Sequence, residues 1–308
     1  SELRRHITCP LLHRCIQSQY PPGSTWKMLI ALAALQEGII DQNSVINSPG
    51  AFRFGGRTFR DHAPAGSYKV RRAVQTSCNV FFYKLGLRIG YDVFEKYGKM
   101  FGFGQRTGID LPNEKSGLFP TREWLLNRYG KHGATRGRLV NYGIGQGEIL
   151  TTPLQMARYV SAIANRGTLH QPHLVNSIYN NMTNNVEPLD YKSKDLPVDK
   201  DNFESVIAGM SDAVNAPGGT SWRARVKDIE VCGKTGTSQN PHGEDHAWFV
   251  SFAPRKNPEL VLAVFVENAG YGGVHAAPIA QKILEKHFYP DSLNNEGQPK
   301  DKQQLTSN

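Results

Sequence analysis

The sequence predicts an α+β fold in which an antiparallel sheet is flanked by helices. Three observations predict it: an almost wholly apolar segment follows Ser24, strand-type runs occupy residues 247–253 and 260–266, and a last helical segment spans residues 278–287. Helices that are segregated from an antiparallel sheet pack against it as layers around a shared core. The 308 residues suffice for one large domain or two small ones.

The first helix is expected to begin at Ser24 and to end near Gly38. The preceding segment Tyr20-Pro21-Pro22-Gly23 is a stiff, non-helical lead-in, because each proline drives the residue before it away from helical geometry. Apolar residues then occupy nearly all faces of the helix. This pattern indicates a helix buried at the centre of the domain.

The middle of the chain is expected to alternate between loops and helices. Residues 41–70 are rich in Gly, Pro, Asn and Arg and are expected to form loops. A second helix is expected from about residue 71 to 74 and again over 80–87, with Ser77 at the break. Thr152-Pro153 begins a third helix, since proline suits the first helical turn.

Late in the chain the apolar pattern changes to that of strands, which the turn residues between the runs support. The expected strands cover residues 229–232, 247–253 and 260–266. A last helix is expected from about Pro278 to His287. Residues 176–202 are polar and are expected to be irregular, and the tail after Pro290 is expected to be disordered. We therefore divide the chain into a domain over residues 1–288 and a tail over 289–308.

The composition is that of a globular protein, with 39% apolar and 20% charged residues. No stretch approaches the roughly 18 to 20 apolar residues that a membrane span requires. The net charge is +9, but the basic residues are scattered, and no nucleic-acid-binding module with a basic stripe is present. We therefore expect no nucleic-acid partner. The N-terminal Ser-Glu-Leu-Arg-Arg-His has no apolar core of a signal peptide, which leaves open a cytosolic protein or one whose export segment is missing here.

The cysteines do not indicate a metal site. Cys9, Cys15, Cys78 and Cys232 match neither a zinc-binding spacing nor a dense disulfide framework. Cys9 and Cys15 could pair in an exported protein, a point that the sequence leaves open. We expect buried thiols instead, and we expect no metal and no cofactor.

The residues with chemical potential fall in short motifs that occur in a fixed order. They are Ser24-Thr25-Trp26-Lys27, Ser77-Cys78-Asn79 and Lys234-Thr235-Gly236-Thr237. Each motif alone is weak, because such patterns arise by chance. Their context strengthens them: the first enters a buried helix, the second lies between helical segments, and the third lies in a strand region.

The motifs favour an activated serine nucleophile. Ser24 and Lys27 lie one helical turn apart, so that their side chains can meet. A serine hydroxyl needs a base beside it at neutral pH, and a lysine can serve if burial and a neighbouring cation keep it neutral. Lys234 would be that neighbour. The helix start at Ser24 and a strand edge at Thr237 would offer backbone N–H groups to a developing oxyanion.

This ordered set is the one that penicillin-binding proteins and class A β-lactamases share. Further segments resemble elongation-type class B penicillin-binding proteins, the penicillin-binding protein 2 family, over most of residues 15–288. Those segments are 19–25 (QYPPGST), 101–104 (FGFG) with 107–111 (TGIDL), 119–124 (FPTREW) and 143–147 (GIGQG). The resemblance implies the transpeptidase fold of penicillin-binding proteins and serine β-lactamases, with an all-helical subdomain beside the sheet.

The resemblance also implies roles for the motif residues. Ser24 would be acylated by the penultimate D-Ala carbonyl of a stem peptide or by a β-lactam, and Lys27 would take its proton. Ser77 would relay a proton to the leaving amine, and Asn79 would bond Lys27 and the substrate amide. Lys234, Thr235, Gly236 and Thr237 would hold the terminal carboxylate, and the backbone amides of Ser24 and Thr237 would form the oxyanion hole.

The family further implies a biological setting. The partners would be peptidoglycan stem peptides, β-lactam antibiotics and a membrane glycosyltransferase of the elongation machinery. The family has an N-terminal membrane anchor and a non-catalytic pedestal, neither of which occurs in this sequence. We therefore expect an excised soluble domain that natively resides on the periplasmic face of the bacterial inner membrane.

A few residues depart from the family pattern or fit a different kind of site, so each has an alternative interpretation. Trp26 and Cys78 stand where the family often has Phe and Ala, and we expect both to affect packing. Glu123-Trp124-Leu125-Leu126-Asn127 fits the pattern of the deacylating glutamate of class A β-lactamases, but Thr121 is expected to cap a helix there, which explains an acidic first turn. We expect a polar loop around Asp61 and His62 in preference to a metal site with His132 and His242.

Two glycine-containing segments are expected near the cleft without a catalytic role. Residues 143–147 form a loop that brings backbone close to a ligand or is merely flexible. Tyr271-Gly272-Gly273 is expected to flank the cleft, with His275 as a candidate for a substrate channel. Two rival functions stay open: a β-lactamase on the same fold, and a β-lactam sensor or silent scaffold.

Overall fold

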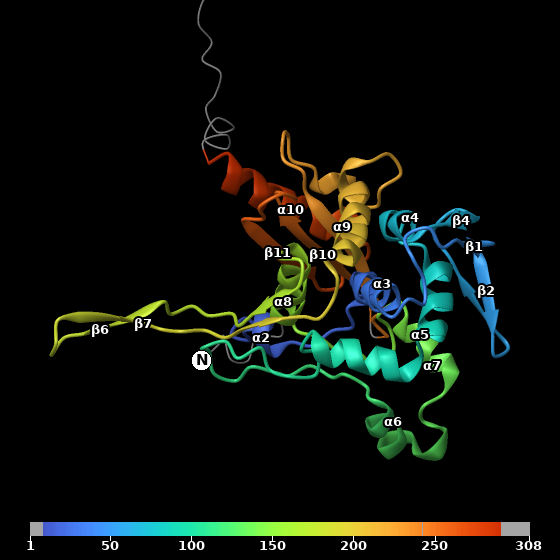
Figure 1. Cartoon of the computed structure of the whole chain (residues 1–308), viewed down its shortest axis with the longest axis horizontal. Coiled ribbons are helices and arrows are strands. Elements are labelled where there is room, and N and C mark those ends of the chain that lie inside the picture. The colour runs from blue at the N-terminus through green and yellow to red at the C-terminus, as the bar shows by residue number, and fades with distance from the viewer. Residues whose placement is uncertain (1–8, 242, 291–308) are drawn as a thin grey trace, which may run out of the picture.

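A computed structural model describes residues 9–241 and 243–290. The central sheet consists of β9 (Cys232–Ser238), β10 (His246–Ala253) and β11 (Leu260–Val266), which pair antiparallel in the order β11-β10-β9. Figure 1 shows helices on both sides of this sheet. The predicted α+β class is thus confirmed.

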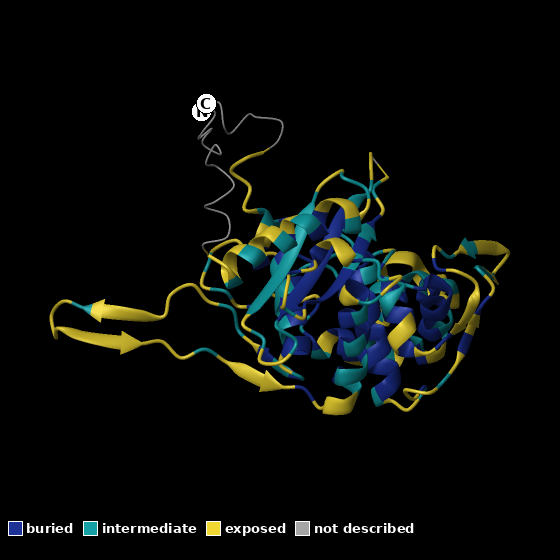
Figure 2. Cartoon of the chain, turned by 90° about the horizontal axis from the view of Figure 1, so that it is seen from above, coloured by how far each residue is buried: buried dark blue, intermediate teal, exposed yellow. Residues whose placement is uncertain are grey.

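The alternation of side chains along β10 produces two cores. Trp248, Val250 and Phe252 join the main core on the helical side, whereas Ala247 and Phe249 face a smaller core under α10 (Gly272–Phe288). Because neighbouring residues of a strand point to opposite faces, one strand that is buried on both sides must be apolar throughout. The main core is the larger dark region of Figure 2.

The helical part surrounds α3, which spans Lys27–Gln36 and is buried from Lys27 to Leu35. Helix α3 contacts α5 (Asn79–Met100) and α9 (Lys200–Asn215), and α9 also contacts α4 (Val70–Gln75) and β9. This arrangement places the start of α3 beside the edge strand of the sheet. The remaining helices of the described residues are α2 (Arg14–Gln17), α6 (Arg122–Tyr129), α7 (Arg136–Tyr142) and α8 (Pro153–Ala164), with 3₁₀ turns at Gly23–Trp26, Gly130–His132 and Trp222–Ala224. In the described part of the chain, no helix combines the length and the apolar character that crossing a membrane requires.

Short antiparallel strand pairs lie outside the central sheet. The β6–β7 hairpin projects far from the body in Figures 1 and 2 and is almost wholly exposed. The pairs are β1 (Ile46–Ser48) with β4 (Gly66–Tyr68), β2 (Ala51–Phe54) with β3 (Arg57–Arg60), β5 (Thr168–His170) with β8 (Ser193–Asp195), and β6 (Ser177–Asn180) with β7 (Asn185–Pro188).

Two segments expected to lack regular structure do contain it. Residues 41–70 hold β1 to β4, and the β2–β3 hairpin turns at Gly55-Gly56, where both residues have positive φ. A Gly-Gly pair between two short runs is a hairpin signal that the polar composition obscured. Residues 176–202 hold β6 to β8 and the first turn of α9, so the expectation of an irregular segment was wrong there as well.

The late strands and the last helix differ from expectation at their boundaries. The strands over 247–253 and 260–266 are confirmed to within a residue, but the one expected over 229–232 lies at Cys232–Ser238. Its glycines disfavour strands in general, yet here they allow close packing. Helix α10 begins at Gly272 rather than Pro278, which lies inside it. The tail expected after Pro290 lies outside the described residues.

The earlier helices agree better with expectation. Helices α4 and α5 are separated at Ser77 as expected, although α5 continues to Met100 through a non-helical Gly90. Helix α8 begins at Thr152-Pro153 as expected, and Thr152 caps it with a full capping box to Gln155. Cys78 and Cys232 are buried thiols as expected, whereas Cys9 and Cys15 are exposed, against expectation.

Candidate active site

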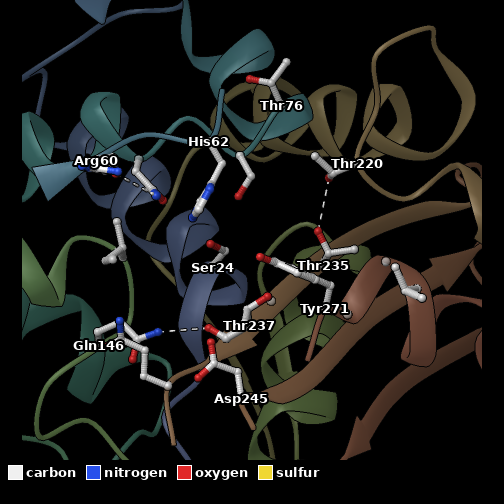
Figure 3. A pocket seen from close by; sticks show the side chains of 18 of the residues that line it. Ser24, Arg60, His62, Thr76, Gln146, Thr220, Thr235, Thr237, Asp245 and Tyr271 are labelled. Carbon is white, nitrogen blue, oxygen red and sulfur yellow. Dashed lines mark hydrogen bonds between the residues drawn. The ribbon is translucent and has the colours of Figure 1, made fainter. Parts of the chain in front are cut away.

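A cleft of about 650 Å³ lies between the helical part and the edge strand β9. Its walls include Ser24, Ser77 and Asn79 from the helical part and Thr235, Gly236 and Thr237 from β9. The predicted motifs are therefore brought together from distant parts of the sequence. Figure 3 shows Ser24 between Thr235 and Thr237 on one side and His62 on the other.

Ser24 lies in the 3₁₀ turn Gly23–Trp26, which precedes α3 without interruption. The backbone N–H of Lys27 donates to the carbonyl of Ser24. Side chains three residues apart are nearly eclipsed in a 3₁₀ turn. The tight turn, rather than the α-helix expected from Ser24 onward, thus places the two side chains on the same side of the chain.

The turn that carries Ser24 is pressed against β9. Gly23 has φ of 55°, and its amide donates to the carbonyl of Gly145 at 2.9 Å. A Cβ atom at Gly23 would overlap the carbonyl oxygen of Thr237, and one at Gly145 would overlap the carbonyl oxygen of Gly23. Only glycine permits both the conformation and the approach. Residues 143–147 therefore support the turn from behind, while Ile144 and Gln146 face the cleft.

Lys27 is wholly buried, and its hydrogen bonds go to neutral groups. Its Nζ donates to Asn79 Oδ1 at 2.6 Å, to the Ser77 carbonyl at 2.7 Å and to Ser77 Oγ at 3.1 Å. Burial lowers the pKa of Lys27 to about 7, although the negative charge of Asp61 opposes this. Among the described residues no hydrogen bond joins Ser24 Oγ to Lys27 Nζ; catalytic contacts often tighten only when substrate binds.

Lys234 approaches the same hydroxyl from β9. Its Nζ donates to Ser77 Oγ at 2.8 Å and to the Thr235 carbonyl at 3.0 Å. Burial holds the pKa of Lys234 well below its usual value, and the charge of Lys27 lowers it further. The Ser77 hydroxyl therefore lies between the two lysine amines, within hydrogen-bond distance of each.

The turn Ser77-Cys78-Asn79 connects α4 to α5. Ser77 has φ of 58°, which is uncommon for a residue with a side chain. Asn79 is the first residue of α5, and its Nδ2 donates to the carbonyl of Arg60. Such a strained turn persists only when its surroundings hold it.

Cys78 and Trp26 have the packing roles expected of them. Cys78 is the N-cap of α5, and burial raises the pKa of its thiol to about 12. Trp26 is fully buried and packs against Phe94, Phe103 and Phe119. Neither side chain is among those that line the cleft.

Several residues of the cleft were not among the predicted site residues. Gln146 Nε2 donates to the Thr237 carbonyl at 3.0 Å, and Thr235 Oγ1 donates to Thr220 Oγ1 at 3.2 Å (Figure 3). Arg60 and Asp245 also line the cleft. Gln146 lies in the segment 143–147, which was expected near the cleft without a catalytic role. Arg60, Thr220 and Asp245 lie singly in loops or at strand ends, where no motif marks them.

The remaining residues that the sequence singled out lie partly in the cleft and partly on the surface. Tyr271, Gly272 and Gly273 line the cleft as expected, whereas His275 is exposed and does not. Glu123 is exposed on α6, capped by Thr121 as expected, and is absent from the described walls of the cleft. Over residues 9–241 and 243–290, no group of three or more His, Cys, Asp or Glu side chains could hold a metal ion. His242 lies outside the described residues.

The fold and the cleft together define a class: proteins with a serine at the start of a buried helix and two buried lysines that share a second hydroxyl. Comparisons with known proteins then identify the family. Residues 2–285 match the model of the penicillin binding protein transpeptidase domain. The chain belongs to this family, which confirms the resemblance found in the sequence.

The relatives specify the branch of the family. The chain is 37% identical to peptidoglycan D,D-transpeptidase MrdA of Haemophilus influenzae over 93% of its own length and 47% of the relative's. It is similar to Pseudomonas aeruginosa PBP2 in complex with WCK 5153, with a TM-score of 0.84 and 32% identity over 94% of this chain and 63% of that one.

A further solved structure adds a partner to the comparison. Helicobacter pylori PBP2 in complex with MreC matches with a TM-score of 0.80 and 32% identity over 93% of this chain and 53% of that one. The chain spans about half the length of the curated relative that it matches.

Proposed function

We propose that residues 1–288 form a peptidoglycan D,D-transpeptidase unit that works through an acyl-enzyme at Ser24. The observation that carries this proposal is the pair of buried lysines, both with lowered pKa, that share the Ser77 hydroxyl beside Ser24. A serine becomes nucleophilic when a neutral base lies within reach, and burial supplies such a base here.

The first half of the reaction forms the acyl-enzyme. Ser24 Oγ attacks the penultimate D-Ala carbonyl and gives its proton to Lys27 Nζ. The backbone N–H groups of Ser24 and Thr237 stabilise the tetrahedral oxyanion. When the C–N bond breaks, Ser77 relays a proton to the departing D-Ala amine. The amine of a neighbouring stem peptide then takes the acyl group and releases Ser24.

Lys234 is assigned to the terminal carboxylate of the stem peptide, with the Thr235 and Thr237 hydroxyls and the backbone at Gly236. A carboxylate that enters the cleft favours the charged form of Lys234. That charge in turn disfavours a second charge on Lys27, because both cations would meet at the same hydroxyl. Substrate binding thus helps to keep the general base neutral.

The structure favours transfer over β-lactam hydrolysis. A β-lactamase needs a group that activates water against the acyl-enzyme, and the candidate Glu123 lies exposed on α6. We therefore expect a long-lived acyl-enzyme with β-lactams. The sensor or scaffold alternative shares the cleft but would release no D-Ala from a stem peptide.

The test is a mass spectrum of the intact chain, taken over time after addition of penicillin. We expect one adduct that persists for minutes or longer, maps to Ser24, is lost in Ser24→Ala and is kept in Ser205→Ala, since Ser205 lies on α9 outside the cleft. Rapid return to the unmodified mass would support a β-lactamase. Absence of any adduct would overturn the proposal, and labelling without D-Ala release would favour a sensor.

The relatives support a proposal on the partners and the location of the chain. We propose that the chain acts with the elongation machinery, including a membrane glycosyltransferase, and that its cleft faces the periplasm at the inner membrane. The Helicobacter pylori relative in complex with MreC supports such an assembly. A binding measurement between this chain and its own organism's MreC tests the point, and no binding at micromolar concentration would contradict it.

A further inference from the structure

Asp61 collects more hydrogen bonds than any residue that lines the cleft, although it is not itself part of the lining. It directly follows β3 and is half-buried. Its Oδ1 accepts from the backbone N–H of Asn79 at 2.8 Å and of Ala63 at 3.1 Å. Its Oδ2 accepts from the N–H of Val80 at 2.8 Å, from Cys78 Sγ at 3.0 Å and from Ser48 Oγ at 3.2 Å.

These hydrogen bonds supply α5 with the acidic group that its own first turn lacks. The first N–H groups of a helix lack partners within the helix, and acidic side chains in its first turn often stabilise them. Helix α5 has no acidic residue in its first turn. The carboxylate of Asp61 comes from a different part of the chain and takes that place. It thereby fixes the turn in which Ser77 has its strained backbone.

The same segment also orients the Asn79 side chain. The Arg60 carbonyl accepts from Asn79 Nδ2 at 3.4 Å, which leaves Asn79 Oδ1 to accept from Lys27 Nζ at 2.6 Å. Residues 60 and 61 therefore hold both the backbone and the side chain of Asn79.

We propose that Asp61 is a positioning residue: its carboxylate fixes the turn that presents Ser77 and Asn79 to Lys27. This inference rests on the proposed function. The carboxylate also acts at a distance, because its charge raises the proton affinity of Lys27 against the effect of burial. Among the residues that the structure describes, the other titratable groups that act on or face Lys27 are Lys234 on β9 and Cys78 at the start of α5. Hydrogen bonds from Cys78 and the backbone keep the pKa of Asp61 below its usual value in spite of burial, so that it carries charge.

Two substitutions separate the positioning role of the Asp61 carboxylate from the effect of its charge on Lys27. Asp61→Asn removes the charge and puts an NH₂ group against the N–H and S–H donors. Asp61→Glu keeps the charge but displaces the carboxylate by one methylene. A matched control is Glu114→Gln, because Glu114 is a buried carboxylate that accepts from Thr107 and Gly108 outside the cleft.

The experiment measures the rate of Ser24 acylation by a fluorescent penicillin from pH 5.5 to 9, together with thermal unfolding. At pH 8 we expect both Asp61 variants to react at least about tenfold more slowly than wild type, since small displacements of catalytic groups are costly. In Asp61→Asn the acidic limb of the pH profile moves to lower pH, because Lys27 loses a stabilising negative charge. In Asp61→Glu and Glu114→Gln the limb stays in place, and Glu114→Gln keeps the wild-type rate.

Each outcome decides the matter. Wild-type rates in either Asp61 variant overturn the inference, as does a slow Asp61→Asn whose limb does not move. If Asp61→Asn does not fold, Asp61→Glu still tests the positioning role through its rate. If wild type itself is not acylated, the proposed function fails instead.

Discussion

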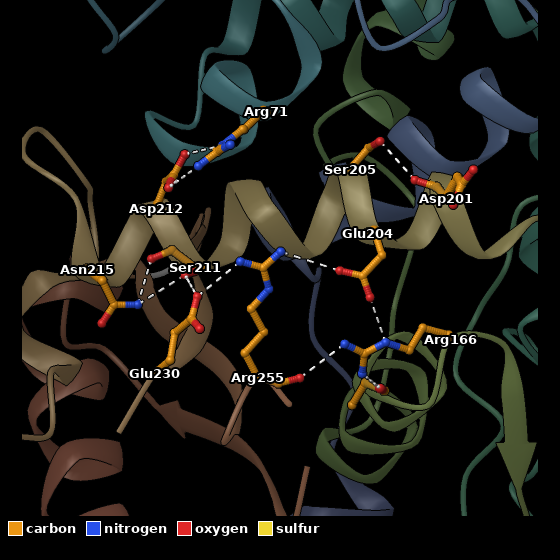
Figure 4. Close-up of polar contacts among 11 residues, drawn as sticks. Arg71, Arg166, Asp201, Glu204, Ser205, Ser211, Asp212, Asn215, Glu230 and Arg255 are labelled. Carbon is orange, nitrogen blue, oxygen red and sulfur yellow. Dashed lines mark hydrogen bonds and ion pairs between the residues drawn. The ribbon is translucent and has the colours of Figure 1, made fainter. Parts of the chain in front are cut away.

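Two pairs of cations in the described chain have opposite surroundings. One pair is Lys27 and Lys234, which lie buried beside the cleft, and the other is a pair of arginines between α8, α9 and the β10–β11 turn. Within the described part of the chain, the lysines bond only hydroxyl, amide and carbonyl oxygens. Arg166 bonds Glu204 at 2.8 Å, and Arg255 bonds Glu204 at 3.4 Å and Glu230 at 3.1 Å (Figure 4). We call Arg166, Glu204, Glu230 and Arg255 the arginine–glutamate cluster.

These surroundings shift the pKa values of the lysines and of Arg255 in opposite directions. Burial without a carboxylate contact lowers the pKa of both lysines. Burial alone would also lower the pKa of Arg255, but the hydrogen bond and the charge of Glu230 outweigh it and raise that pKa. A cation with carboxylate partners stays charged and connects parts of the fold. A buried cation without them can exchange a proton near neutral pH, which is what general base catalysis requires.

The largest effect is expected for Lys27→Met, which removes the base. A positioned base contributes roughly 10²- to 10⁴-fold to a rate, so acylation by fluorescent penicillin should fall by about that factor. Because the substitution also removes the donor to Asn79 Oδ1 and to the Ser77 carbonyl, thermal unfolding is measured alongside to confirm that the variant is folded. Lys96→Met is the control, since Lys96 pairs with Glu37 on the surface. A wild-type rate in Lys27→Met would sink the assignment of the base.

A second pair of variants compares a serine from each region. Ser77→Ala removes the hydroxyl that both lysines share, and we expect acylation to slow by about 10²-fold. Ser211→Ala removes a hydroxyl that donates to Glu230 at 2.6 Å. It should lower the free energy of unfolding by about 1.5–3 kcal/mol and leave acylation unchanged, as for other hydrogen bonds to charged groups. Equal acylation rates in the two variants would contradict the comparison.

The pH dependence should follow the charge on Lys27. The lysine must be neutral to accept the Ser24 proton, so the acylation rate should rise with pH and level off above its pKa of about 7. Well below that value the rate should change about tenfold per pH unit, because the neutral fraction does. Stopped-flow measurement of penicillin acylation from pH 5 to 9 checks this. A flat profile across pH 7 would show that a different group takes the proton.

The smallest effect is expected for Glu204→Gln in the arginine–glutamate cluster. The side chain of Glu204 is 42% exposed, and pairs of that kind contribute at most about 1 kcal/mol. Chemical denaturation should show a loss of that size that shrinks at high salt. Acylation should not change. A loss of several kcal/mol would mean that this cluster is a major support of the fold.

The sequence was sufficient to predict Ser24 as the candidate nucleophile and Lys27 as its base, since the two residues lie one turn apart. It also located the strands at 247–253 and 260–266, because their apolar runs have strand length. The meeting of residues 77–79 with Lys234 was inferred from family resemblance, since contacts between distant segments leave no local pattern. The structure places these residues together, and their roles stay predictions.

Other features had no readable signal or a misleading one. Thr220 acts singly from a loop, so nothing in its neighbourhood marks it. Gln146 lies in the segment 143–147, which was singled out for its glycines and not for this side chain. The sequence predicted only a polar loop around Asp61, because most of the partners of its carboxylate are backbone N–H groups, which every sequence contains. The strand β9 was displaced in the prediction because Gly233 and Gly236, which usually weaken strands, are needed here for close packing against Phe249 and Pro22.

The glycine contacts around Ser24 imply that the two walls of the cleft differ in their capacity to change. On the β9 side, Gly23, Gly145 and Gly236 bring backbone against backbone, so a new side chain there would push the wall apart. The opposite wall presents side chains such as His62 and Tyr83. Substitutions on that wall should therefore be better tolerated than new side chains at Gly23, Gly145 or Gly236, which makes it the place to look for variation that changes inhibitor binding.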